Sequence, residues 1–75
     1  MSGKLSATSC RAARAILGWS TSDLVREAKV SPNTVVKLEA GEPVGEEPKA
    51  RIAAAFEANG VELLNGKSPG ARLRG

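Results

Sequence analysis

Apolar residues recur three or four positions apart in four short stretches, which is the pattern of amphipathic helices that each bury one stripe. The stripes are Cys10, Ala13, Ile16 and Leu17; Leu24, Val25 and Ala28; Val35 and Leu38; and Ile52, Ala55 and Phe56. They predict helices over about 7–17, 21–28 and 32–40. A fourth helix is predicted to have Pro48 in its first turn and to be closed by Gly60, because proline suits a helix start and glycine a helix end.

The ends of the two middle helices are marked by local chemistry. Ser20 and Ser31 can each accept a hydrogen bond from the unpaired backbone donors of a following helix, and Pro32 suits the first position of the second of these helices. Gly41 ends that helix. Only residues 29–30 separate the two helices, so the chain must turn sharply and the helices must cross at a steep angle. This arrangement predicts a helix-turn-helix.

The last fifteen residues have a different pattern. Residues 61–64 and 71–74 partly alternate apolar with charged positions, and Asn-Gly and Pro-Gly turn signals lie between them. They predict a small β-hairpin or extended arm that leans on the helices or pairs with another chain through its open edge; a disordered tail is the alternative. We therefore expect an all-α, compact bundle of four short helices: an N-terminal tail over 1–5, the helix-turn-helix domain over 6–60 and the hairpin or arm over 61–75.

Composition narrows the class of protein. The chain has 75 residues, 41% apolar and 25% charged, which is typical of one globular domain. It lacks an apolar run of the ~20 residues that span a bilayer and the apolar core of a signal peptide, so a cytoplasmic protein without a membrane partner is expected. With no histidine and one cysteine, Cys10, neither a disulfide nor a metal site nor a cofactor is predicted. Cys10 is interpreted as a small buried hydrophobe, and no enzyme is expected.

A specific series of residues runs through the first four helices. An arginine in the first helix, a glycine with an apolar residue, a sharp turn and a Leu-Glu-x-Gly ending follow one another at Arg14, Gly18-Trp19, Leu24, Val30-Ser31 and Leu38-Glu39-Ala40-Gly41. In this series residues 9–64 resemble the Xre-type, phage-repressor-like helix-turn-helix family. The resemblance implies a DNA-binding repressor that usually dimerises and places its third helix in the major groove of each half-site. It also implies an ion pair between Arg14 and Glu39.

The resemblance further implies which residues contact DNA. By position, Asn33 and Lys37 are the base-contacting candidates, since Asn can bond adenine and Lys can reach guanine acceptors. Next to them, Pro32 can contact a thymine methyl, and the hydroxyls of Ser31 and Thr34 can bond phosphates or base edges. Thr21 and Ser22, at the start of the preceding helix, can bind a phosphate. The alternatives are an ordinary solvated face for the base-contacting pair and capping alone for Ser31.

Charge and one backbone position complicate this picture. The net charge of the chain is +3, but residues 20–48 carry a net charge of −3. Val36 lies off the buried stripe of its helix, where it can contact a thymine methyl or a protein. The family commonly has glycine where Lys29 stands, so a left-handed Lys29 would carry about 1–2 kcal/mol of strain.

Two functions therefore remain open. The first is a sequence-specific DNA-binding transcriptional regulator, a small repressor or antitoxin-like protein, with double-stranded DNA and a second copy or a protein partner. The second is a protein-interaction module, an antiactivator or adaptor, that does not bind DNA. Neither includes a small-molecule ligand domain.

Overall fold

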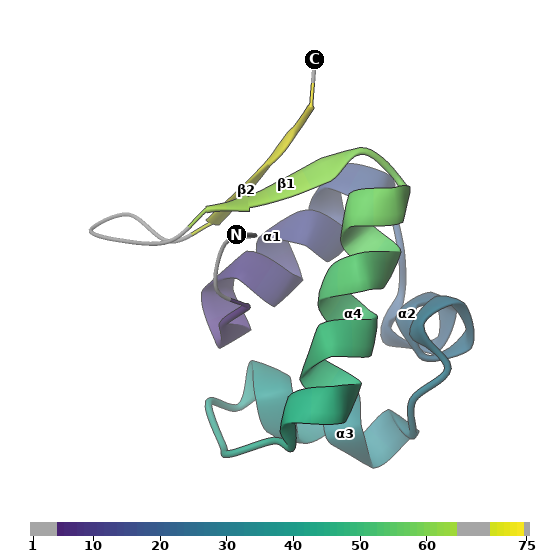
Figure 1. The fold of residues 1–75 in the computed structure, drawn as a ribbon, viewed down its shortest axis with the longest axis vertical. Helices are drawn as coiled ribbons and strands as arrows, with labels where there is room; N and C mark the ends of the chain where they lie inside the picture. The colour runs from purple at the N-terminus through teal and green to yellow at the C-terminus, as the bar shows by residue number, and fades with distance from the viewer. Residues whose placement is uncertain (1–4, 65–69, 75) are drawn as a thin grey trace.

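The structure is a computed structural model that describes residues 5–64 and 70–74. In this part of the chain four helices precede a two-stranded antiparallel sheet (Figure 1). The elements are α1 (Ala7–Leu17), α2 (Thr21–Ala28), α3 (Pro32–Glu39), α4 (Glu46–Ala58), β1 (Val61–Leu64) and β2 (Gly70–Leu73). The predicted four short helices and C-terminal hairpin are confirmed. Of the predicted tail over residues 1–5, only Leu5 is described, and it is buried in the core; residues 1–4 and the predicted turn over 65–69 lie outside the described residues. No helix in the described part is long and apolar enough to cross a bilayer.

Helix α1 is capped at both ends by residues that directly flank it. The hydroxyl of Ser6 accepts a hydrogen bond from the backbone N–H of Ser9 at 3.1 Å, and the hydroxyl of Ser9 accepts one from the N–H of Ser6 at 2.8 Å. At the other end Gly18 has φ 68°, which lets the Trp19 N–H reach back to the Arg14 carbonyl at 2.9 Å. This turn brings the ring of Trp19 onto that of Phe56, with ring centroids 5.8 Å apart.

The core lies between the helices and extends under the hairpin. Phe56, Leu24, Ile52 and Val35 are fully buried, and Val61 of β1 belongs to the same cluster. Of the stripe predicted for the first helix, Cys10 and Ala13 are fully buried, while Ile16 and Leu17 are only partly so. Because side chains from every helix meet in one cluster, the orientation of α3 is fixed by the whole domain.

The hairpin packs against helix α1. Both strands contact α1, and β1 also contacts α4. The strands are antiparallel, with Val61 opposite Leu73 and Glu62 opposite Arg72. The Arg72 Nε donates to Glu62 Oε1 at 3.0 Å across the strands. The predicted packing of the hairpin on the helices is therefore confirmed. Figure 1 places this hairpin at the opposite end of the molecule from α3.

Candidate nucleic-acid interface

The connection between α2 and α3 is as short as predicted. Lys29 adopts the left-handed conformation, with φ 58° and ψ 48°, and its N–H donates to the Val25 carbonyl at 2.9 Å. Val30 follows with a second hydrogen bond to the same carbonyl at 3.3 Å. Since a side chain in this conformation is disfavoured, Lys29 carries strain of about 1 kcal/mol that the packing of both helices must offset.

Both helices start at the predicted serine caps. The hydroxyl of Ser20 accepts from the Asp23 N–H at 3.1 Å, and the Asp23 carboxylate accepts from the Ser20 N–H at 2.9 Å. The hydroxyl of Ser31 accepts from the Thr34 N–H at 3.2 Å, and Pro32 takes the first helical position. These caps fix the residue at which each helix begins, and therefore which side chains point outward.

Helix α3 has a buried side and an exposed side. Val35 and Leu38 are 0% and 5% exposed and face the core. Asn33 and Lys37, four residues apart, are exposed together on the other side. Val36 is 61% exposed and lies next to them by helical spacing, as predicted. The outer face of α3, which we define as Pro32, Asn33, Val36 and Lys37, is thus open to a partner.

The start of α2 adjoins this outer face. Thr21, Ser22 and Val25 line one shallow groove with Pro32 and Val36 of α3. We call this feature the α2–α3 groove. The groove brings the candidate phosphate-binding hydroxyls of Thr21 and Ser22 beside the start of α3, where the resemblance implied that base contacts are made.

The structure places Ser31 and Thr34 on a different side. Their hydroxyl oxygens are 2.9 Å apart and share a hydrogen bond, and the two residues line a depression together with Glu47 and Arg51 of α4. The capping role of Ser31 is therefore present in the structure. Asn33 and Lys37 do not line this depression, so the candidate set divides between the α4 side and the outer face of α3.

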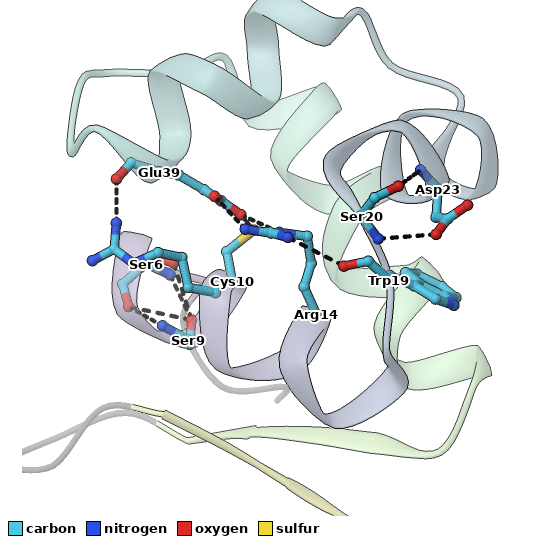
Figure 2. Close-up of polar contacts among 9 residues, drawn as sticks. Ser6, Ser9, Cys10, Arg14, Trp19, Ser20, Asp23 and Glu39 are labelled. Carbon is cyan, nitrogen blue, oxygen red and sulfur yellow. Dashed lines mark hydrogen bonds and ion pairs between the residues drawn. The ribbon is translucent and has the colours of Figure 1, made fainter.

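An ion pair holds α3 against α1. The Arg14 Nε donates to Glu39 Oε2 at 2.7 Å, and the Arg14 Nη2 donates to Glu39 Oε1 at 2.8 Å (Figure 2). The two side chains are only 20% and 13% exposed. The remaining terminal nitrogen, Nη1 of Arg14, donates to the Trp19 carbonyl at 3.1 Å. One arginine thus connects α1, the start of α2 and the end of α3, and the ion pair implied by the resemblance is present.

Two further contacts to Glu39 were missed by the sequence analysis. The Cys10 thiol, which Figure 2 shows beside Glu39, donates to Glu39 Oε2 at 3.2 Å. Nη1 of Arg11 donates to the Glu39 carbonyl at 2.6 Å. Cys10 is fully buried, as predicted, but it also acts as a hydrogen-bond donor. The signal was the spacing of Cys10 and Arg14, which lie one turn apart on the same side of their helix.

These contacts shift the pKa values of the groups involved. Burial alone would raise the pKa of the Glu39 carboxyl, but hydrogen bonds from Arg14 and Cys10 outweigh it and hold that pKa below its ordinary value. Burial, reinforced by the hydrogen bond to Glu39, raises the pKa of the Cys10 thiol well above its usual range, so the thiol stays protonated. Hydrogen bonds from Ser20 and Arg26 lower the pKa of the exposed Asp23 carboxyl.

Residues 20–48 are acidic along the chain, but the fold brings arginines from outside the segment to some of their carboxylates, which makes the segment less repulsive to DNA. Three of its acids are hydrogen-bonded to arginines: Glu39 to Arg14, Asp23 to Arg26, and Glu47 to Arg51. Two of these arginines lie outside the segment. Counting them with their partners reduces the net charge from −3 to −1. None of the five residues that line the α2–α3 groove is acidic.

The hydrogen bonds of Glu39 predict that the stability of the fold depends on pH. Because the pKa of Glu39 is lower in the folded protein, its contribution to stability is present above its ordinary value of 4.5 and is lost as the pH falls through the folded value. The wild-type melting temperature should therefore drop more steeply than that of Glu39→Gln when the pH is lowered from about 6 to 3. Equal slopes for the two proteins, measured by circular dichroism, would contradict the assignment.

The site as a whole presents an amide, an ammonium group, two hydroxyls and an aliphatic surface on adjoining parts of α2 and α3. These groups suit hydrogen bonding to base edges and phosphates and apolar contact with a base. Comparison of the sequence with protein-family models gives no match, and comparison with curated proteins finds no significant relative.

Proposed function

We propose that the chain is a sequence-specific DNA-binding transcriptional regulator, a small repressor or antitoxin-like protein. In this proposal α2, the turn at Lys29 and α3 form a helix-turn-helix, and α3 enters the major groove. One observation carries the proposal: Asn33 and Lys37 are exposed side by side on a short helix whose other side is fixed by the core and by the Arg14–Glu39 ion pair. A helix held in this way presents its outer side chains in one defined orientation, as sequence recognition requires.

Each exposed group has a matching chemistry on DNA. The side-chain amide of Asn33 suits the N6 and N7 atoms of adenine, and the ammonium group of Lys37 suits the O6 and N7 acceptors of guanine. The hydroxyls of Thr21 and Ser22, with the backbone N–H groups at the start of α2, suit a phosphate oxygen. These contacts would orient the helix on the backbone while α3 determines the sequence.

A second copy of the chain would supply the affinity that one domain lacks. The outer face of α3 carries one basic residue, Lys37, and non-specific affinity grows with the number of phosphates that are neutralised. A homodimer doubles these contacts and places two α3 helices on half-sites about 34 Å apart. Arg72 lies on β2 and Arg74 directly follows that strand, and the hairpin is at the opposite end of the molecule from α3 (Figure 1), so we assign these two residues no base contacts.

The experiment is capture of genomic fragments by the purified protein, followed by binding to the most enriched duplex at 50 to 200 mM salt. We expect a log–log plot of affinity against salt to fall linearly. Lys37→Ala should weaken binding to this duplex at every salt concentration and relax the preference at a guanine, because Lys37 is assigned to a base edge and not to a phosphate. Lys49→Ala removes a lysine on α4 that does not line the α2–α3 groove; it is the matched control and should bind the duplex as the wild type does.

A protein-interaction module is the second candidate, and the exposure of Val36 and Leu73, 61% and 62%, favours it. An interface centred on either of these aliphatic side chains, which lie at opposite ends of the molecule, would not weaken steeply with salt, because it neutralises no phosphates. A protein partner recovered in place of DNA, with salt-insensitive affinity that Val36→Ala lowers, would favour this function and contradict DNA recognition.

A further inference from the structure

Three of the five residues that line the α2–α3 groove are aliphatic, whereas a surface that contacts DNA is expected to be mostly polar. It has a volume of about 140 Å³ and is walled by Val25 from α2 and by Pro32 and Val36 from α3. The hydroxyl residues Thr21 and Ser22 complete its lining. Val36 is 61% exposed, so its aliphatic side chain is left for a partner to cover.

We propose that this groove binds the C5-methyl group of a thymine, and that Val36 makes the protein select thymine at one position of each half-site. The inference rests on the proposed function, because it requires α3 to lie in the major groove. Of the four unmodified bases, only thymine presents a methyl group in the major groove of DNA, while the edges of the others present hydrogen-bond donors and acceptors. A small aliphatic pocket is therefore complementary to thymine and to no other unmodified base.

The position of the groove supports this occupant. Val36 lies between Pro32 and Lys37 on the outer face of α3, so a base contacted there is next to the bases assigned to Asn33 and Lys37. The volume also suits the group: a cavity of about 15 Å³ already holds one water, so 140 Å³ accepts a methyl and the edge of its ring.

The charges around the groove do not oppose the approach of DNA. None of the lining residues is charged, and the nearby Asp23 carboxylate is hydrogen-bonded to the Ser20 N–H and to Arg26 at 2.8 Å. Lys37 supplies a positive charge on the outer face of α3. A phosphate backbone can therefore approach Thr21 and Ser22 while a thymine methyl enters between Val25 and Val36.

The test uses duplexes enriched by the purified protein from a random-sequence library at moderate salt. Each thymine of the best duplex is replaced in turn by deoxyuridine, which removes the methyl group and leaves every hydrogen-bonding atom in place. For the wild-type protein we expect one replacement per half-site to weaken binding about fourfold, the effect of losing one buried methyl-sized contact. In Val36→Ala this difference between thymine and deoxyuridine should disappear.

Two variants sharpen the comparison. Val36→Thr keeps the shape of the side chain but puts a hydroxyl in the groove, and it should also lose most of the methyl effect. Leu73→Ala truncates an aliphatic side chain of matching exposure, 62%, at the hairpin end, and it should keep the full fourfold difference. Both altered side chains are exposed, so thermal melting should report intact folds.

The contradicting results separate the inference from the proposed function. If a duplex is enriched and Lys37→Ala weakens its binding, but no deoxyuridine replacement matters, the groove does not bind thymine and the helix still contacts DNA. A methyl effect that survives in Val36→Ala would place the methyl elsewhere and would also overturn the inference. If no duplex is enriched, or if Val36→Ala instead disrupts binding of a protein partner, the proposed function fails together with the inference.

Discussion

Replacing Arg14 with Ala is expected to lower the free energy of unfolding by about 3 kcal/mol. The substitution removes two hydrogen bonds to Glu39 and one to the Trp19 carbonyl. It leaves the Glu39 carboxylate, 13% exposed, with the Cys10 thiol as its remaining side-chain donor within residues 5–64 and 70–74. Breaking a buried pair from one side costs about 3–5 kcal/mol, and the partial exposure here places the expected loss at the lower end.

Such a loss is large for this protein, since a 75-residue domain has a total stability of roughly 4–11 kcal/mol. Urea denaturation of the wild type and Arg14→Ala measures it. Arg11→Ala is the matched control, because Arg11 lies on the same helix and also contacts Glu39, but through an exposed hydrogen bond to the Glu39 carbonyl. We expect Arg11→Ala to lose less than about 1 kcal/mol. Equal losses in the two variants would contradict the role assigned to the ion pair.

The second large effect is expected at the outer face of α3. Asn33→Ala and Lys37→Ala should each weaken binding to the preferred duplex about 5- to 150-fold, because each removes a contact worth roughly 1–3 kcal/mol of discrimination. Asn33→Ala should also relax the preference at an adenine, and Lys37→Ala the preference at a guanine. Fluorescence anisotropy with the preferred duplex and with single-base variants measures both effects.

Both side chains are exposed, so the variants should unfold within about 0.5 kcal/mol of the wild type. Lys49→Ala again serves as the control and should bind like the wild type. If both outer-face variants bind every duplex as the wild type does, Asn33 and Lys37 are not the base-contacting residues. The ordinary solvated face would then be the correct interpretation of this side of α3.

The helices and their ends could be predicted from sequence because the responsible contacts are local. Ser20 and Ser31 each bond a backbone N–H three residues later, and Gly41 has the φ of 80° that a helix end of this kind needs. Such features depend on neighbouring residues alone, so pattern and capping rules were sufficient to place them.

The contacts that sequence reasoning missed connect residues far apart in the chain. Cys10 and Arg11 meet Glu39 across 29 and 28 positions, which depends on how α1 crosses α3. The same holds for charge: counted along the chain the middle segment is acidic, whereas Arg14 and Arg51 neutralise part of it from outside. The α2–α3 groove likewise requires the relative position of two helices, which neither helix specifies alone.

In the proposed function, DNA binds to the start of α2 and the outer face of α3. Titration of the isotope-labelled protein with its preferred duplex, followed by backbone amide NMR shifts, maps this interface residue by residue. We predict that the largest shifts fall on Thr21, Ser22, Asn33, Val36 and Lys37, with little change in β1 and β2. Shifts confined to the hairpin, or no saturable shifts with any enriched duplex, would contradict the proposed interface.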